Sequence, residues 1–399
     1  MNLSRIRTDY SHTIYASYIG YITQAIINNF APLLFLHFMS EYSFSLRQIT
    51  LITTLNFLVQ LLVDLISAKT IDRIGYRKAV MAAHVFSAAG LAGLAVLPDI
   101  LPSYAGLLLC VVLYAVGGGI IEVLISPIVE SCPTEKKEAA MALLHSFYCW
   151  GHLGVVLIST LFFASAGISR WRILAFAYAS VPLFNLVYFS MVPIYPIVKE
   201  GSGMSIRGLM RSGFFWLLFM LMICAGASEQ AMSQWSSAFA ESALHVSKTV
   251  GDLAGPSAFA LFMGTARALY GRYSEKLPLL KAMIASSVLC IFCYFLAAFG
   301  GSPAAGLLGC AVCGFSVGIL WPGTFSLAAK GMPAGGTAMY ALLALAGDVG
   351  CSSGPTAVGM IASLFSGNMK AGLTAAVIFP VLMMTGSIIA LKLSSKKES

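Results

Sequence analysis

Apolar runs of about 20 residues recur along the whole chain, and this is the length that an α-helix needs to cross the hydrocarbon core of a bilayer. With 58% hydrophobic and only 10% charged residues, the chain differs from soluble proteins, in which about 25% of residues are charged. No stretch shows the alternating pattern of a membrane β-strand. The sequence therefore predicts an all-α polytopic membrane protein.

We expect about twelve membrane-spanning helices. Their centres fall near residues 25, 60, 88, 117, 152, 182, 227, 263, 289, 316, 350 and 381. Arg5 and Arg7 precede an apolar segment that is too long for the apolar part of a cleavable signal peptide. The first span should therefore remain in the mature protein.

Lys and Arg residues are distributed unevenly between the two sides of the predicted spans. Arg267 lies within a span, and the side opposite the termini has only Arg47, Arg170, Arg172, Lys248 and Lys370. The rest of the 24 basic residues lie on the side of the termini. Because basic loops stay in the cytoplasm, we expect cytoplasmic termini and a location in the plasma or inner membrane. The net charge of +8 then reflects topology rather than a nucleic-acid partner.

The longest polar connection is the basic stretch YPIVKEGSGMSIRGLMRSG, which is rich in Gly and Ser and begins at Tyr195. It separates two equal sets of predicted spans, so we expect an N-terminal bundle over 1–194, a cytoplasmic linker over 195–212 and a C-terminal bundle over 213–399. Residues of the second span are echoed at the same spacings in the eighth. The pairs are Asp64 with Arg267, Ala68 with Gly271, Asp72 with Glu275, and Arg73 with Lys276. The echo supports a duplicated fold.

The stretch AKTIDRIGYRKAV, residues 68–80, resembles the loop signature of the major facilitator superfamily. Asp72, Arg73 and Gly75 match the signature directly. Its first residue is alanine where the signature has glycine, and one expected arginine comes a residue later, at Arg77. The resemblance implies two pseudo-symmetric six-helix bundles that transport a solute by alternating access.

Within the superfamily, the chain looks most like the fucose–proton symporter-like group and its uncharacterised bacterial relatives. The stretches that resemble this group are QAIINNFAPLLF from Gln24, Glu122 after a run of glycines, and HSFYCWG from His145. This narrower resemblance implies proton-coupled uptake of a sugar or a similar small polar solute.

In the superfamily, the loop aspartate caps a helix N-terminus of the opposite half when the cytoplasmic side is closed. A carboxylate in that position gains about 0.3–1 kcal/mol, which suits a latch that must also release. The resemblance and the echo together predict gating or latch residues near the two loops: Asp64, Asp72, Arg73, Gly75, Arg77, Arg267, Gly271 and Glu275. The alternative is a charged loop that only fixes topology.

Carboxylates inside the predicted spans outnumber cations. The acids are Asp64, Glu122, Glu229 and Asp348, and Arg267 is the permanent cation. A charge near the bilayer centre costs about 2.5–3.5 kcal/mol on insertion scales, so such residues usually serve function. Because one arginine cannot neutralise four acids, we predict proton coupling at Glu122, Glu229 and Asp348, with sodium as the alternative ion. For Glu122, a structural hydrogen-bonded acid and a direct substrate contact also remain open.

Neutral polar groups gather on the first, fifth and seventh predicted spans. Amides and aromatic rings suit a neutral polyhydroxylated solute, because amides both donate and accept hydrogen bonds. The predicted substrate-binding residues are Asn28, Asn29, His145, Tyr148, Gln230, Gln234 and Trp235. Each of them could instead join helix to helix. Pro32 should kink the first span just after the two asparagines.

We predict no metal, no cofactor and no enzymatic site. The chain lacks HExxH, GxSxG and a phosphate-binding glycine loop. Four cysteines have a spacing typical of zinc sites but lie in apolar segments that oppose thiolate formation, so we expect them to pack. They are Cys290, Cys293, Cys310 and Cys313.

The leading interpretation is a secondary transporter that takes up a sugar or another small polar solute with a proton. The alternative is a proton-antiporting exporter of amphipathic compounds, of the multidrug type, in the same fold. Its expected partners are the solute, the coupling cation and the lipid bilayer, and we expect a monomer. The single intramembrane arginine argues against a strongly anionic substrate.

Overall fold

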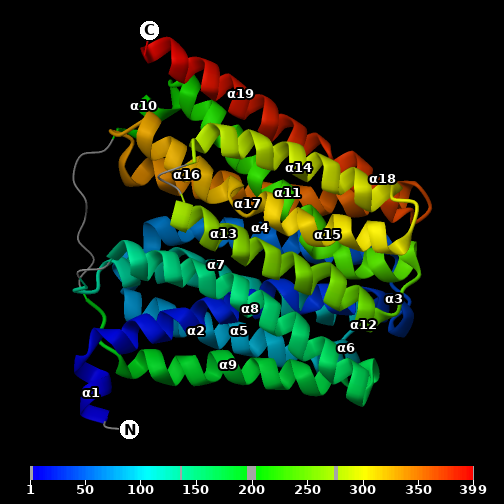
Figure 1. Ribbon diagram of the computed structural model, residues 1–399. Coiled ribbons are helices and arrows are strands. Elements are labelled where there is room, and N and C mark those ends of the chain that lie inside the picture. The colour runs from blue at the N-terminus through cyan, green and yellow to red at the C-terminus, as the bar shows by residue number, and fades with distance from the viewer. Residues whose placement is uncertain (1–2, 135–136, 196–203, 274–276, 399) are drawn as a thin grey trace. The chain divides into compact units, whose positions relative to one another are not determined.

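The computed structural model describes residues 3–134, 137–195, 204–273 and 277–398, and every regular element in these ranges is a helix (Figure 1). The chain divides into two compact units. The first unit comprises residues 1–44 and 55–199, and the second comprises residues 45–54 and 200–399. Residues 196–203 of the expected linker lie outside the described residues, and the linker boundaries remain a prediction.

The first unit is built from long helices joined by short turns. In chain order they are α1 (Leu3–Thr8), α2 (Tyr10–Asn29), η1 (Ala31–Leu34), α3 (Phe35–Glu41), α4 (Leu46–Ile74), α5 (Tyr76–Leu94), α6 (Leu97–Ile100), α7 (Ser103–Glu130), α8 (Lys137–Ala166), η2 (Ile168–Arg170) and α9 (Trp171–Met191). The first residues of α4 belong to the second unit. Helix α7 packs against α2 and α5, and α9 packs against α5 (Figure 1).

The second unit repeats this plan. Its elements are α10 (Ile206–Met210), α11 (Gly213–Leu244), α12 (Lys248–Asp252), η3 (Leu253–Ser257), α13 (Ala258–Tyr273), α14 (Leu279–Phe299), α15 (Pro303–Val317), α16 (Leu320–Gly331), α17 (Gly336–Leu364), α18 (Met369–Ala376) and α19 (Ile378–Glu398). Helix α11 packs most extensively against α17, and α14 packs against α15 and α19.

Every predicted span centre falls inside one of these helices. Among the described residues, the segments long and apolar enough to cross a membrane are Tyr10–Glu41, Leu46–Ser67, Ser103–Val129, Leu143–Ala166, Ile168–Met191, Gly213–Leu244, Leu279–Phe299, Pro303–Gly331 and Met369–Ser394. The remaining predicted positions hold α5, α13 and α17. The prediction of an all-α polytopic membrane protein is confirmed.

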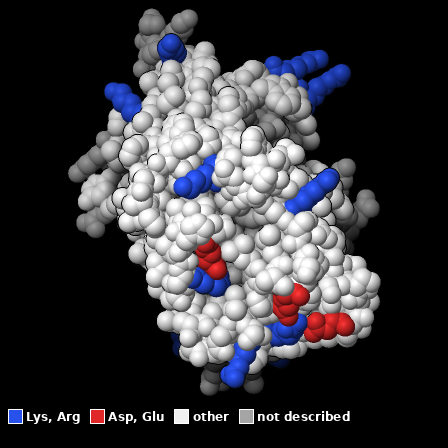
Figure 2. All heavy atoms as spheres, turned by 90° about the vertical axis from the view of Figure 1, so that its right-hand side faces the viewer, with Lys and Arg blue, Asp and Glu red and all other residues white. Residues whose placement is uncertain are grey.

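The surface has the character expected of a protein in lipid. On the face shown in Figure 2, most atoms belong to uncharged residues, and acidic side chains lie next to basic ones. Large apolar side chains are exposed on the long helices, including Leu161, Ile173, Phe184 and Phe292. Soluble monomers rarely expose apolar patches of more than a few hundred Å², whereas a bilayer covers such surface.

Small residues set the close contacts between helices. Helix α7 runs unbroken through the glycine run at residues 117–119. A Cβ at Gly117 would overlap the backbone of α5, and one at Gly118 or Gly119 would press on Gln24 of α2 or on the Gln60 backbone of α4. In the second unit, a Cβ at Gly350 or Gly354 of α17 would overlap the backbone of α11. Such glycines allow helix backbones to approach closely inside a membrane.

Proline interrupts the first span as predicted. Helix α2 ends at Asn29, and Pro32 lies in the short 3-10 helix η1 before the chain continues as α3. Proline lacks a backbone N–H and so removes a helical hydrogen bond at this point. The interruption ends α2 one residue beyond Asn28.

Candidate functional site

The first unit holds a chain of buried amides that ends on Glu122. Gln24 Nε2 of α2 donates to Glu122 Oε2 of α7 (3.1 Å) and to Gln60 Oε1 of α4 (2.8 Å). Gln60 Nε2 donates to Asn28 Oδ1 (2.9 Å) and to Asn56 Oδ1 (3.0 Å), and Asn56 Nδ2 donates to Asn28 Oδ1 (3.1 Å). These four amides, which we call the amide cluster, are only 2–6% exposed. Glu122 itself is half-buried.

Helical spacing builds the amide cluster. Gln24 and Asn28 are four residues apart on α2, as are Asn56 and Gln60 on α4, so each pair lies on one helical face. Gly118 makes room for them, because a Cβ at that position would lie 2.8 Å from Gln24 Oε1. The glycine run next to Glu122 therefore serves to bring α2, α4 and α7 together around polar groups.

The Gln24 side-chain amide is held through its NH2 group, while its carbonyl oxygen has no hydrogen bond. Its Nε2 donates two hydrogen bonds, whereas the buried Oε1 accepts none. A buried acceptor left without a hydrogen bond costs about 1–3 kcal/mol. The acceptor oxygens of Glu122 and Gln60 thus determine which way this amide points.

A second group of polar side chains lies beside Glu122, one turn further along α7. Tyr21 Oη of α2 is 3.0 Å from Ser126 Oγ, and the Tyr21 ring lies 5.5 Å from the ring of His145 on α8. His145 is exposed and Tyr148 is half-buried on the same helix. These aromatic groups flank the carboxylate from α2 and α8.

Asn29 does not join the amide cluster. Its Nδ2 donates to Ala25 O, one turn back in α2, at 2.9 Å. Of the two asparagines that the sequence singled out, the structure therefore brings only Asn28 into contact with other polar side chains of the cluster.

In the second unit, Glu229 forms an ion pair with Arg267. Arg267 Nη2 of α13 lies 3.2 Å from Glu229 Oε2 of α11, and Arg267 Nε donates to Gly318 O at 3.3 Å. Gln230 Nε2 donates to Glu229 Oε1 (3.3 Å), and Gln234 Nε2 donates to Gln230 Oε1 (3.2 Å). The sequence assigned Glu229 to coupling and Arg267 to gating, but the structure joins them in a single contact.

Trp235 and Asp348 occupy packed positions. The Trp235 side chain is fully buried, and its indole N–H donates to Pro355 O of α17 at 2.9 Å. Asp348, on the same helix α17, is 7% exposed. Trp235 thus fastens α11 to α17, which is the helix-to-helix alternative for this residue.

The predicted gating residues are only partly described. Arg77 donates to Phe189 O (2.8 Å) and Val192 O (2.8 Å), so it caps the C-terminus of α9 within its own unit. Gly75 has a φ of 87°, which favours glycine, where α4 turns into α5. Asp64 is half-buried in α4. The remaining residues of the latch lie outside the described side chains: Asp72, Arg73, Gly271 and Glu275. The latch remains a prediction.

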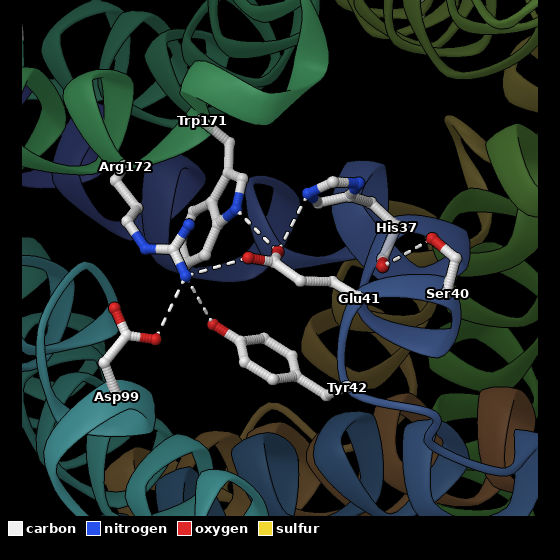
Figure 3. A network of polar contacts seen from close by, with 7 residues as sticks. All are labelled: His37, Ser40, Glu41, Tyr42, Asp99, Trp171 and Arg172. Atoms are coloured by element: carbon white, nitrogen blue, oxygen red, sulfur yellow. Dashed lines mark hydrogen bonds and ion pairs between the residues drawn. The ribbon is translucent and has the colours of Figure 1, made fainter.

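Figure 3 shows a polar cluster at the far end of the first unit from its N-terminus. Arg172 Nη2 of α9 donates to Glu41 Oε1 (2.8 Å), Tyr42 Oη (2.9 Å) and Asp99 Oδ1 (3.1 Å). Glu41 Oε2 also accepts from Trp171 Nε1 at 3.1 Å. Burial, and then the neighbouring Glu41 carboxylate, raise the pKa of Tyr42 to about 12. The phenol therefore stays neutral at physiological pH, and α3, α6 and α9 are joined by one arginine.

The second unit has a comparable cluster at the end of its own first long helix. Lys248 Nζ lies 3.2 Å from Glu241 Oε1 of α11 and 3.1 Å from Asp252 Oδ2. Asp252 is fully buried, and its Oδ1 accepts from Ser237 at 2.5 Å. Each unit thus pairs an acid at or near the end of its first span, Glu41 or Glu241, with a cation from another of its helices.

The cysteines with zinc-like spacing are buried in α14 and α15. Cys290 Sγ and Cys313 Sγ are 3.9 Å apart. The described part of the chain contains no group of three or more His, Cys, Asp or Glu side chains arranged to hold a metal ion.

Reading the sequence alone missed Gln24, Asn56 and Gln60 as members of the site. A signal was present, because Asn56, Gln60 and Asp64 repeat every fourth residue along a predicted span. An amide or acid at each turn of an apolar helix forms a polar stripe that has to meet polar partners in the membrane.

The Major Facilitator Superfamily model matches residues 17–355 of the chain. No curated protein matches the sequence at a significant level. FucP, the fucose–proton symporter of E. coli, has a similar fold in an outward conformation, with 14% identity and a TM-score of 0.65 over 94% of this chain and 98% of that one. A D-xylose–proton symporter has 14% identity and a TM-score of 0.74 over 95% of each chain. A bacterial homologue of the human lysosomal transporter Spinster, inward-facing and occupied, has 15% identity and a TM-score of 0.75 over 96% of this chain and 97% of that one.

Proposed function

The chain belongs to the major facilitator superfamily, and from this premise we propose that it takes up a sugar or another small polar solute together with a proton. Members of this family are secondary transporters rather than enzymes. The proposal includes a place in the fucose–proton symporter-like group, a multi-pass position in the plasma or inner membrane with cytoplasmic termini, and a monomer.

The observation that carries the proposal is the contrast between Glu122 and Glu229. Gln24, a neutral amide, donates a hydrogen bond to Glu122, whereas Glu229 lies against the permanent charge of Arg267. A proton taken up by Glu229 would leave the arginine charge uncompensated in a buried site, which is costly. A proton taken up by Glu122 removes a charge from its amide surroundings. We therefore propose Glu122 as the coupling residue of the three predicted acids.

The amide cluster supports a hydroxylated solute. Asn28 and Asn56 lie one helical turn from Gln24 and Gln60, and carboxamides match hydroxyl groups because both donate and accept hydrogen bonds. Two of the similar solved structures are sugar–proton symporters. D-xylose and fucose are therefore the first solutes to test.

The exporter alternative receives less support from this geometry. A lipophilic cation needs an acid to pair with, and Arg267 already compensates Glu229. Efflux of such cations remains an outcome that the transport experiment can return.

The test uses the purified protein in proteoliposomes with an imposed proton gradient. We expect Glu122→Gln to abolish uphill accumulation of the transported sugar but to leave exchange at equal concentrations on both sides largely intact. Asp99→Asn, an acid outside the site, should keep both activities. If uphill uptake survives in Glu122→Gln but is lost in Glu229→Gln or Asp348→Asn, coupling belongs to the second unit. If the protein transports lipophilic cations but no sugar, the exporter alternative would replace the proposal of sugar uptake.

A further inference from the structure

The hydrogen bonds of the amide cluster all run in one direction. Starting at Glu122, donors point from Gln24 to Gln60, from Gln60 to Asn28 and Asn56, and from Asn56 to Asn28. An amide oxygen and an amide NH2 group have nearly the same shape but opposite hydrogen-bonding roles. A half-turn of each amide would therefore leave the packing unchanged.

Such a half-turn yields a second complete network. With all four amides rotated, Gln60 Nε2 donates to Gln24 Oε1, and Gln60 Oε1 accepts from Asn28 and Asn56. Asn28 Nδ2 then also donates to Asn56 Oδ1. The number of hydrogen bonds within the cluster is the same in both networks, and rotating only one amide would place two acceptors or two donors against each other. The cluster is thus a two-state element.

The protonation state of Glu122 determines which of the two networks is favoured. An ionised carboxylate only accepts, so it requires the Gln24 Nε2 seen in the structure. A protonated carboxyl can donate, and Gln24 Oε1 can receive that hydrogen bond only in the rotated state. In the present state this oxygen is buried and accepts no hydrogen bond. After the rotation it accepts from Gln60 and from the protonated Glu122, and Nε2 takes over the position that has no partner within the cluster.

We propose that Gln24 and Gln60 form an amide relay that reverses the polarity of Asn28 and Asn56 when Glu122 takes up a proton. The relay rests on the proposed role of Glu122 in proton coupling. In the present state Asn28 directs Oδ1 into the cluster, and in the reversed state it directs Nδ2 there. The group that Asn28 presents on its other side changes from a donor to an acceptor, which changes the hydroxyl geometry it can bind. The reversal itself moves only side chains of the cluster, so it would link the proton on Glu122 to the solute-binding groups before the backbone moves.

Other titratable groups around Glu122 have to be separated from this effect. The Tyr21 phenol of α2 lies within electrostatic reach of Glu122, with His145 of α8 against its ring, and Asp64 lies one turn beyond Gln60 on α4. Helix α5 presents Ala83 and Ser87 to α7. The readout must therefore follow the Glu122 proton itself.

Two spectroscopic signals test the relay in the purified full-length protein in lipid nanodiscs. The infrared C=O band of a protonated carboxyl, identified by its loss in Glu122→Gln, reports the proton on Glu122. Side-chain 15N resonances of selectively labelled asparagine report the amides, and the chain has few of them: Asn2, Asn28, Asn29, Asn56, Asn185 and Asn368. Asn368, whose Oδ1 caps α18 in the second unit, is the internal reference.

In the wild type, we expect the Asn28 and Asn56 signals to shift with pH in step with the infrared band, while Asn368 stays fixed. Gln60→Met keeps the side-chain length but removes the amide, so the band should still titrate and the Asn28 shift should be lost. Gln24→Met should also abolish the Asn28 shift, and a titrating band shows in each variant that Glu122 still takes up a proton. A wild-type Asn28 signal that ignores the band, or an Asn28 signal that still follows it in Gln60→Met, would overturn the relay. Neither signal needs a solute or a gradient, so the relay and proton-coupled uptake can fail independently.

Discussion

Arg267 and Glu229 stabilise the second unit as a pair. Arg267→Met would leave the Glu229 carboxylate, only 10% exposed in its side chain, beside an uncharged neighbour. Removing one partner of a buried ion pair typically costs about 3–5 kcal/mol, whereas replacing both with uncharged groups can be nearly neutral. We expect a large drop in the thermal unfolding temperature of Arg267→Met in detergent and substantial recovery in the double variant with Glu229→Gln. Equal drops in the single and double variants would mean that Arg267 stabilises the unit through Gly318 alone.

For single residues, the sequence predicted which chemical groups form the site better than it predicted which residues they contact. It pointed to Glu122, Asn28 and Glu229, because charged and amide groups are unusual inside apolar spans. It assigned Arg267 to gating because this residue lies close to the loop along the chain. The contact with Glu229 was missed because a long arginine side chain can reach well away from its own Cα. The partners depend on which helices face each other, and a single sequence does not contain that information.

Arg172 organises three elements of the first unit. One Nη2 atom reaches acceptors on α3, on Tyr42 directly after α3, and on α6. A lysine ends in a compact, strongly hydrated ammonium group on a flexible stem, whereas the guanidinium is planar, more weakly hydrated and better suited to a partly buried ion pair. We expect Arg172→Lys to lower the free energy of unfolding by up to about 1.5–3 kcal/mol, the range for hydrogen bonds to charged groups. Thermal unfolding in detergent measures this difference.

The neighbouring Arg170→Lys is a matched control, since Arg170 is exposed and the exchange is the same. If both substitutions lower the free energy of unfolding equally, the loss comes from exchanging arginine for lysine in general and not from the contacts of Arg172. The pH dependence gives a second check through Tyr42, whose pKa is raised to about 12. Its raised pKa stabilises the fold fully below the ordinary tyrosine value of 10, and this stabilisation is lost as the pH rises toward 12.

Helix positions and the two interruptions that carry a proline were predictable from the sequence, but the contacts at these interruptions were not. Apolar length fixes a span, and Pro32 marks the break after α2 through its missing N–H. The break between α15 and α16 lies just before Pro322, which cannot donate the helical hydrogen bond to Gly318 O. That carbonyl instead accepts a hydrogen bond from Arg267 of α13. The donor comes from another helix, so the local sequence does not identify it.

For the whole molecule, composition and the loop signature were enough to predict the family. Bilayer thickness dictates helix length, and backbone satisfaction in lipid leaves few alternatives to helices. The solute is a different matter, because selectivity depends on how a few amides such as Asn28 and Asn56 are oriented. Their orientation depends on neighbours from other helices and on the protonation of Glu122, and composition describes neither.

The orientation of the chain in the membrane can be tested with two introduced cysteines. Gly213, at the start of α11, and Gly301, between α14 and α15, both have open space where a Cβ would be added, so cysteine should be tolerated at each. Background labelling should be low, because the native cysteines are buried except for the half-buried Cys351. An impermeant maleimide added to intact cells should label Gly301→Cys and not Gly213→Cys, since the basic segment before α11 should face the cytoplasm. Inverted vesicles should reverse the pattern. A reversed result in both preparations would place the termini outside the cell. Labelling of both positions from one side would mean that an even number of spans separates them. That would contradict the three spans predicted from α11 to α14.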